Sequence, residues 1–65
     1  MRILGIDPGI AIVGFGLVET ERGKSRLVRC GVITTPAHTP LSARLHSIYL
    51  DLTELLETLK PDAIA

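Results

Sequence analysis

Asp7 is the one acidic residue in the sequence whose position suggests a role in catalysis or metal binding. Asp7 follows the apolar run of residues 3–6 and precedes Pro8-Gly9, a dipeptide typical of tight turns. A strand end holds a carboxylate rigidly, and hard cations such as Mg²⁺ prefer carboxylate and water oxygens. Asp7 is therefore a candidate metal ligand and catalytic residue. The alternative is that its side-chain oxygen only organises the turn.

No second carboxylate can be assigned to the same site from the sequence. Phosphodiester hydrolysis by two metal ions about 4 Å apart needs several converging carboxylates. The other acidic residues are predicted on a hairpin, on the polar side of a helix or in the turn after it, where we expect them to be solvated. They are Glu19, Glu21, Asp51, Glu54, Glu57 and Asp62.

The histidines and the single cysteine lack the spacing of a catalytic or metal-binding motif. His38 lies in a proline-flanked loop and His46 on the flank of a predicted helix, so both are expected at the surface. Cys30 falls within a predicted strand and is interpreted as a small core residue.

A group of basic residues is the other feature that suggests a ligand. Such a group can contact phosphates, but a charged hairpin can equally serve to keep the protein soluble and to protect a sheet edge. Its members are Arg22, Lys24, Arg26 and Arg29. The only aromatic residues, Phe15 and Tyr49, are predicted in the core, so no base-stacking surface is expected.

Composition favours one small, soluble domain. The 65 residues are 46% hydrophobic, which argues against disorder. Seven basic and seven acidic residues balance, so the strongly basic character of a complete nucleic-acid-binding surface is missing. The apolar run at the N-terminus is too short for a signal peptide, and no stretch approaches membrane-spanning length. We expect a cytoplasmic protein without membrane contact.

Three strands are predicted in the first half of the chain. Residues 3–6 have the continuous apolar character of a central strand buried on both faces. Residues 10–19 and 26–35 predict two further strands, joined into a hairpin by the polar segment 20–25. Gly14 and Gly16 lie two residues apart, on one side of their strand, where another group can approach closely.

A helix is predicted after the loop of residues 36–40. Thr39 is the expected N-cap, with Pro40 at the first helical position. Apolar residues then recur at spacings of three and four, and Pro61 ends the helix after Lys60. The apolar stripe consists of Leu41, Leu45, Ile48, Tyr49, Leu52, Leu55, Leu56 and Leu59.

Residues 63–65 predict the opening of a fourth strand, so we expect the chain to end within an element. A right-handed crossover through the helix places this strand parallel to the first, in the order third, second, first, fourth. One helix covers only one face of such a sheet, and cover for the other face is expected from elsewhere.

The ordered motifs of the whole chain resemble the start of the RuvC family of Holliday-junction resolvases. The resemblance rests on Leu-Gly-Ile-Asp-Pro-Gly at 4–9, Gly-Phe-Gly at 14–16, Arg44-Leu45 within the helix and Lys-Pro-Asp at 60–62. It implies an α/β, ribonuclease H-like mixed sheet. Residues 1–65 would form the N-terminal part of a single nuclease domain, with three strands, the first helix and the start of the fourth strand.

The resemblance further implies a Mg²⁺-dependent endonuclease that resolves four-way DNA junctions by paired, symmetric cleavage in recombination and repair. It implies a homodimer that works with a branch-migration motor of the RuvA-RuvB type. Asp7 is the only catalytic, metal-binding residue that carries over, since the family's next carboxylate, a glutamate, lies past Ala65. The 65 residues alone are therefore expected to be inactive.

Three other interpretations remain at this stage. The actin, Hsp70 and sugar-kinase superfamily has a similar opening that cradles ATP phosphates, but residues 10–12 contain no hydroxyl and Pro8 lacks an N–H donor. A nuclease family of RNA processing also opens with Gly-Ile-Asp-x-Gly. A non-catalytic interaction domain could share the fold without its chemistry.

Overall fold

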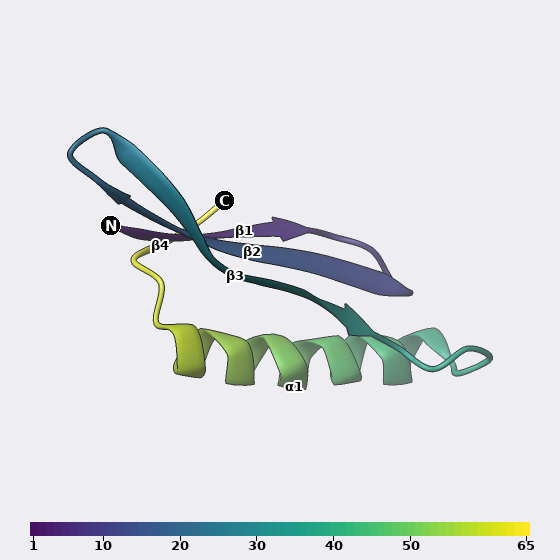
Figure 1. The fold of residues 1–65 in the computed structure, drawn as a ribbon. Helices are drawn as coiled ribbons and strands as arrows, with labels where there is room; N and C mark the ends of the chain where they lie inside the picture. Colours follow the sequence, from purple (N-terminus) through teal and green to yellow (C-terminus); the bar gives the residue numbers. More distant parts are fainter.

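Three antiparallel strands and one short parallel strand form a single sheet. The computed structural model describes all 65 residues, with β1 at Arg2–Asp7, β2 at Ile12–Glu21, β3 at Lys24–Thr34 and β4 at Ala63–Ile64. The sheet order is β3-β2-β1-β4, with β4 parallel to β1. Helix α1, Leu41–Leu59, lies against one face (Figure 1). The predicted mixed sheet and its strand order are confirmed.

The β2–β3 hairpin is longer than the sequence suggested. Pairing continues to Glu21 and Lys24, so only Arg22 and Gly23 form the turn. Their φ angles of 52° and 78° are both positive, as a two-residue type I′ turn requires. The prediction of a six-residue connection at 20–25 was wrong because a turn of this type matches the twist of the strands and lets polar residues continue them.

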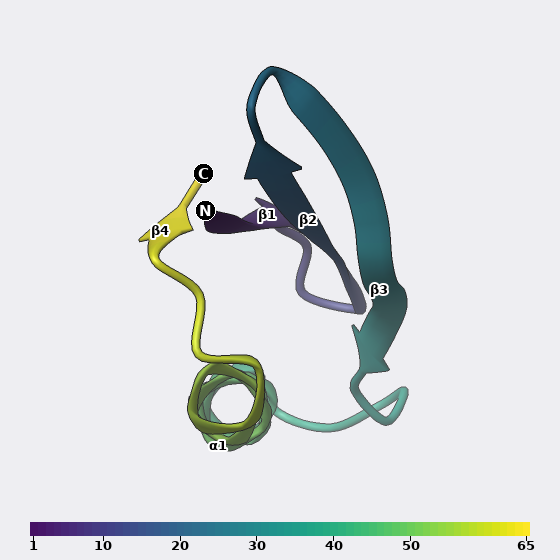
Figure 2. The same ribbon diagram turned by 60° about the vertical axis from the view of Figure 1, so that its left-hand side comes forward.

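A register shift bends β3 part-way along its length. Leu17 pairs with Arg29, whereas Val18 pairs with Leu27, which leaves Val28 without a partner on β2. One extra residue on one strand bends that strand and increases its twist. Figure 2 shows the long, curved course of β3 from the hairpin to α1.

The core lies between the sheet and the C-terminal half of α1. Leu4 and Leu17 are paired across β1 and β2, and both are fully buried. They contact Leu59 of α1. Partly buried residues that pack against this cluster are Ile6, Phe15, Leu55 and Leu56. The predicted core position of Phe15 is confirmed.

The opposite face of the sheet has no covering element, and we call it the open face. Strand alternation places Gly5, Asp7 and Gly14 on it, since Leu4 and Leu17 point to the helix. Cys30, paired with Gly16, is exposed. The prediction that Cys30 is a core residue was wrong, because its side of the sheet is not covered in this structure.

Helix α1 begins one residue later than predicted. Pro40 is the N-cap residue and no side chain caps the helix. The hydroxyl of Thr39 instead donates to the carbonyl oxygen of Pro36 at 2.9 Å, so both predictions for Thr39 and Pro40 were wrong. The other end agrees to within one residue: Lys60 is the left-handed C-cap, and its N–H donates to Leu56.

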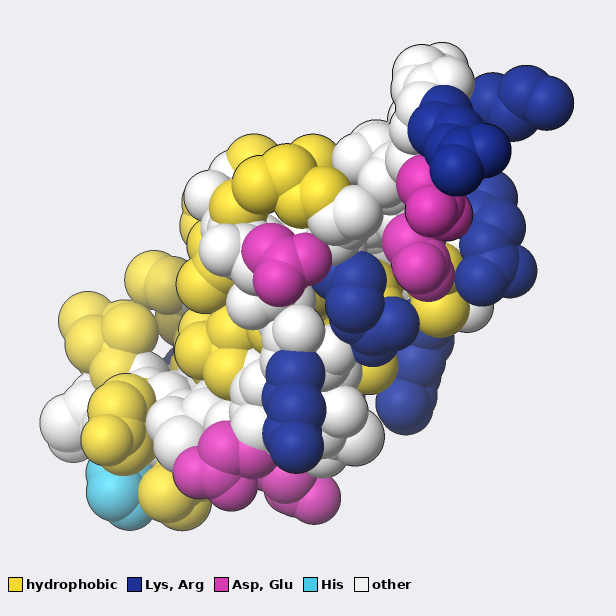
Figure 3. Space-filling model, turned by 90° about the vertical axis from the view of Figure 1, so that its left-hand side faces the viewer, with side chains coloured by type: hydrophobic (Ala, Val, Ile, Leu, Met, Phe, Trp, Pro, Cys, Tyr) yellow, Lys and Arg dark blue, Asp and Glu magenta, His cyan; other side chains and the backbone are white.

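The apolar stripe of α1 is only partly used. Its C-terminal leucines reach the core, whereas Leu41, Leu45 and Tyr49 are more than half exposed, Tyr49 by 65%. The core position predicted for Tyr49 was therefore wrong. Figure 3 shows hydrophobic side chains, in yellow, reaching the surface. The helical periodicity identifies an apolar face but does not say which part of it the sheet contacts.

Candidate metal-binding end of the central strand

Asp7 is the last residue of β1, the strand with a neighbour on both sides. It pairs with Gly14 of β2, and the N–H of the preceding residue, Ile6, donates to Ala65 at 3.0 Å. A Cβ placed on Gly14 would lie 3.5 Å from the Cβ of Asp7. The backbone of Asp7 is thus paired with β2 on one side, and the residue before it is held on the other side by Ala65. The exposed side chain of Asp7 lies next to Gly14, which has no side chain.

The turn after Asp7 is organised without its carboxylate. Thr35 holds the segment, because its N–H donates to Ala11 at 3.1 Å and its hydroxyl to the carbonyl oxygen of Ile10 at 2.7 Å. The carboxylate of Asp7 accepts no hydrogen bond, and it has no ion-pair partner. In this structure the Asp7 carboxylate thus makes no hydrogen bond that would organise the turn, and both of its oxygens are free to bind a ligand.

Gly9 lets the chain reverse closely in front of Asp7. A Cβ at this position would collide with the carbonyl oxygen of Ile12, so the backbone would have to move. Replacing Gly9 by Ala should destabilise the fold by about 1–3 kcal/mol, as overpacking does. Gly5→Ala is the matched control, since its nearest contact would be 3.8 Å away. Urea denaturation followed by circular dichroism measures both, and equal losses would contradict the expectation.

A shallow hollow on the open face adjoins Asp7. Its lining includes Gly5, Gly14 and Gly16, so the floor beside the carboxylate is largely backbone. The predicted close approach to Gly14 and Gly16 is thus available from the open face. A phosphate group or a hydrated cation could reach Asp7 along this floor.

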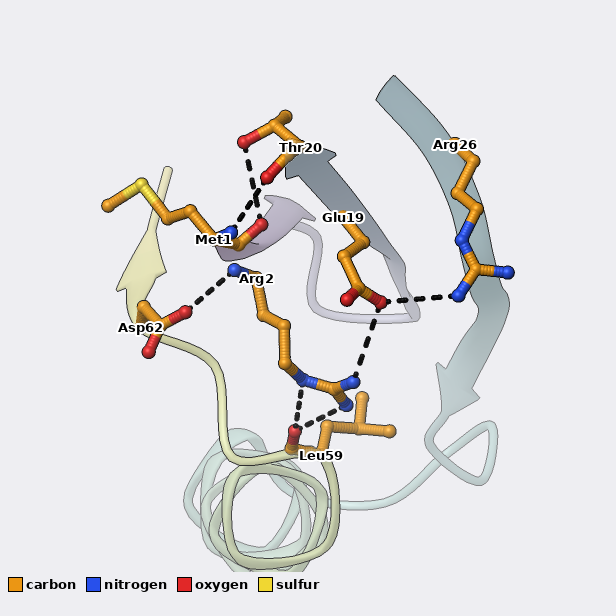
Figure 4. A network of polar contacts seen from close by, with 7 residues as sticks. All are labelled: Met1, Arg2, Glu19, Thr20, Arg26, Leu59 and Asp62. Carbon is orange, nitrogen blue, oxygen red and sulfur yellow. Dashed lines mark hydrogen bonds and ion pairs between the residues drawn. The ribbon is translucent and has the colours of Figure 1, made fainter. Parts of the chain in front are cut away.

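A network of polar contacts ties the start of β1 to the end of α1 (Figure 4). The guanidinium of Arg2 donates twice to the carbonyl oxygen of Leu59, at 3.1 and 2.7 Å, and lies 4.0 Å from Glu19. The N–H of Arg2 donates to the Asp62 carboxylate at 2.7 Å. Glu19 also contacts Arg26 at 3.4 Å.

Two acidic residues in this network correct the sequence interpretation. Glu19 and Asp62 were expected to be solvated only, yet each accepts contacts that hold elements together. Sequence reasoning missed Arg2 altogether, because its partner at the helix end is a backbone carbonyl 57 residues away. No sequence pattern encodes such a contact. The network supports the strand that carries Asp7 rather than contributing ligands.

The structure brings no second candidate to Asp7. No three His, Cys, Asp or Glu side chains are grouped so that they could hold a metal ion. Asp51, Glu54 and Glu57 are exposed on α1, and the predicted surface positions of His38 and His46 are confirmed. A free carboxylate at a rigid strand end fits Mg²⁺ chemically as one oxygen ligand. Asp7 supplies one ligand of a site, not a whole site.

The chain is similar to known proteins along its full length. A family model described as crossover junction endodeoxyribonuclease RuvC matches residues 3–65. The chain belongs to the RuvC family. Relatives named crossover junction endodeoxyribonuclease RuvC from Brevibacillus brevis and Syntrophomonas wolfei are 52% and 46% identical over all 65 residues. The matched segment is 39% and 38% of those relatives.

Solved structures of a RuvC protein share the fold. A structure of Thermus thermophilus RuvC in complex with a Holliday junction substrate superposes with a TM-score of 0.86 at 35% identity. The match covers 98% of this chain and 41% of that one. A second T. thermophilus RuvC structure gives a TM-score of 0.80 at 33% identity. The ribonuclease H-like assignment of the sheet and helix is thereby confirmed for this segment.

Membership of the RuvC family excludes two of the three alternatives left open by the sequence. The family match and the superposition place the chain in the RuvC family, and not in the actin, Hsp70 and sugar-kinase superfamily or in the RNA-processing nuclease family. Helix α1 does not combine the length and the apolar character needed to cross a membrane. The chain spans about two fifths of the length of its curated relatives.

Proposed function

We propose that this segment supplies Asp7 as a catalytic, Mg²⁺-binding carboxylate to an endonuclease that cuts four-way DNA junctions. The observation that supports this most is the free carboxylate at the end of β1. It lies in the segment that matches the RuvC family, it accepts no hydrogen bond, and it borders an open floor of glycines. An aspartate whose role was to organise the turn would accept hydrogen bonds from it.

We infer that the chain contributes a rigid backbone that fixes the position of the Asp7 carboxylate. β2 and β4 fix the backbone of β1 on both edges, and Gly9 with Thr35 keeps the following turn close. Asp7 would bind the ion through its carboxylate oxygens, and Gly14 leaves room for the scissile strand beside it. A bound Mg²⁺ would stabilise the charge that develops on the phosphate oxygens.

Several broader properties belong to the same proposal. Residues 1–65 form the N-terminal part of a single nuclease domain, and the other metal ligands come from outside this segment. The active protein is a cytoplasmic homodimer, since two-fold symmetry presents equivalent sites to equivalent strands of a junction. A branch-migration motor of the RuvA-RuvB type supplies it with junctions in recombination and repair.

The test is cleavage of a synthetic four-way junction by a chain of the relatives' length that carries these 65 residues at its N-terminal end. We call this the family-length protein. Cleavage in Mg²⁺ at paired, symmetric positions, with linear duplex left intact and no cuts in EDTA, is the expected result. The 65-residue chain alone should not cut, because Asp7 is the only one of its carboxylates that lies at the proposed site.

Two results would count against the proposal. Junction binding without cleavage in Mg²⁺ or Mn²⁺ would favour a non-catalytic interaction domain. Equal cleavage of linear duplex and junction would remove the structural specificity, even if Asp7 were a metal ligand. The symmetry of the cuts is read from the products of the four separately labelled strands.

A further inference from the structure

The β2–β3 hairpin concentrates positive charge at one end of the molecule. Four of the seven basic residues lie within positions 22–29, and every residue from 21 to 30 is exposed. Figure 3 shows dark-blue side chains gathered at the end formed by this hairpin. The tip of the hairpin has the basic residues Arg22, Lys24 and Arg26, and we call these three the hairpin cluster.

Most of this charge has no partner within the chain. Arg26 contacts Glu19 at 3.4 Å, but Glu19 also contacts Arg2. Arg22 and Lys24 make no ion pair. Together with Glu19, Glu21 and Ser25, the hairpin cluster lines a shallow hollow at the tip, and no hydrophobic residue contributes to its lining. Two basic side chains are therefore free to bind an external anion.

The tip of the hairpin is a paired β-ribbon closed by a two-residue turn, and it contains no irregular loop. The N-terminal segment contacts β2 as far as Thr20, which exchanges two hydrogen bonds with Met1, and the β2–β3 ladder continues past it to Glu21 and Lys24. Residues 21–24 thus form the end of a two-stranded ribbon that projects beyond β1 and is closed by the tight turn at Arg22 and Gly23. A ribbon of this kind is narrow enough to lie in or along a groove of duplex DNA.

The hairpin cluster lies far from Asp7 along the sheet. Asp7 pairs with Gly14, seven residues before Glu21, and a strand rises about 3.4 Å per residue, so the two sites are separated by roughly 24 Å. DNA rises about 3.4 Å per base pair. A duplex arm that leaves a crossover near Asp7 would reach the hairpin after about seven base pairs.

We propose that the hairpin cluster binds backbone phosphates of a duplex arm of the junction, as a second contact remote from the cleavage site. The proposal rests on the proposed function, which brings DNA to Asp7. The alternative is that the charged hairpin only protects a sheet edge. In that case removing its charges would not change DNA binding. The contact should not depend on the DNA sequence, because backbone phosphates are the same at every base pair.

The turn itself allows a clean test. Arg22→Asn removes a charge and creates Asn-Gly, the sequence most favoured in a type I′ turn, so a folding defect at the hairpin is not expected. Lys24→Gln removes the second charge at an exposed strand position. Lys60→Asn is the matched control, since Lys60 is also exposed, basic and left-handed, with φ of 48° against 52° for Arg22.

Binding of the family-length protein to a four-way junction is measured in EDTA between 50 and 200 mM salt. Each phosphate contact contributes about 0.9 to the slope of log K against log salt. The Arg22→Asn/Lys24→Gln variant should therefore have a slope smaller by about 1.8 for each hairpin that contacts an arm, and by about 3.6 when both hairpins of the proposed homodimer do. Over this fourfold range the unaltered homodimer should lose roughly 10²-fold more affinity than the variant. Glu21→Gln, which removes a repelling charge, should tighten binding.

Each outcome decides a separate question. No junction binding by the unaltered protein would remove the proposed function and this inference with it. Normal binding, with the slope of the double variant unchanged, would overturn the hairpin contact alone and leave the proposed function standing. A decrease in Lys60→Asn as large, for each charge removed, as in the double variant would also overturn it, because the effect would then reflect net charge. In that case the hairpin would be free for an acidic protein partner.

Discussion

Asp7→Asn is expected to lower the rate of junction cleavage by the family-length protein by at least about 10²–10³-fold. Asparagine keeps the shape of the side chain but removes the negative charge that a hard cation requires. Metal stabilisation of transition-state charge is worth several kcal/mol, and each 1.36 kcal/mol is a factor of ten in rate. Single-turnover cleavage of a labelled junction in Mg²⁺ measures the loss.

The position of Asp7 makes this variant easy to interpret. Its carboxylate is exposed and accepts no hydrogen bond, so the substitution should leave folding and junction binding in EDTA unchanged. Asp51→Asn, at an exposed site on α1, is the control and should cut normally. A cleavage rate within threefold of the unaltered protein would remove Asp7 from the catalytic site.

The second large effect concerns stability. Leu17→Ala should destabilise the 65-residue chain by about 2–5 kcal/mol, because Leu17 is fully buried against Leu4 and Leu59 and truncation leaves a cavity. A chain of this length has a free energy of unfolding of only about 3–10 kcal/mol. The variant is thus expected to lose most of its folded population, observed as a loss of the urea transition in circular dichroism.

Leu27→Ala provides the matched comparison. Leu27 is 61% exposed on β3, and truncation of an exposed side chain usually changes stability by no more than about 0.5 kcal/mol. The two variants remove the same atoms from neighbouring strands, so the difference between them isolates burial. Similar losses for both would show that the cluster around Leu17 is not the core of this chain.

Sequence patterns predicted the framework of the site well because the decisive signals are local. Pro8-Gly9 marks the end of β1, and the apolar spacing of α1 with Pro61 marks the crossover. Once those elements are known, handedness alone places β4 beside β1. The position of Asp7 at the end of a central strand follows from the same reasoning. That its carboxylate has no hydrogen-bond partner could not be predicted, because this depends on the tertiary structure around it.

The wrong predictions concern features that depend on tertiary context. Thr39 has an N-cap residue type, but its hydroxyl donates to the carbonyl oxygen of Pro36 in the loop and accepts no N–H from the helix. Cys30 and Tyr49 have core-like patterns, and both are exposed because nothing in this structure covers their sides of the sheet and helix. The register shift at Val28 is likewise invisible in a simple alternation, since one extra residue changes the face of all that follow.

The candidate site was predicted in part for the same reason. A carboxylate before Pro-Gly is a local signal, so Asp7 could be proposed from the sequence as a candidate metal ligand. The contacts of Arg2 join residues separated by up to 60 positions, and no spacing rule reaches that far. The family resemblance supplied what the residues alone could not, namely the reaction and the need for carboxylates from outside this segment.

The pairing of β4 with β1 has a consequence for synthesis on the ribosome. The N–H of Ile6 donates to the carbonyl oxygen of Ala65, and the N–H of Ala65 donates to that of Leu4. One edge of β1 therefore stays unpaired until residues 63–65 have been synthesised. At 5–20 residues per second, that interval is roughly 3–12 s, whereas a hairpin forms in microseconds. During it the strand that carries Asp7 presents an unpaired edge, to which a neighbouring nascent chain could add.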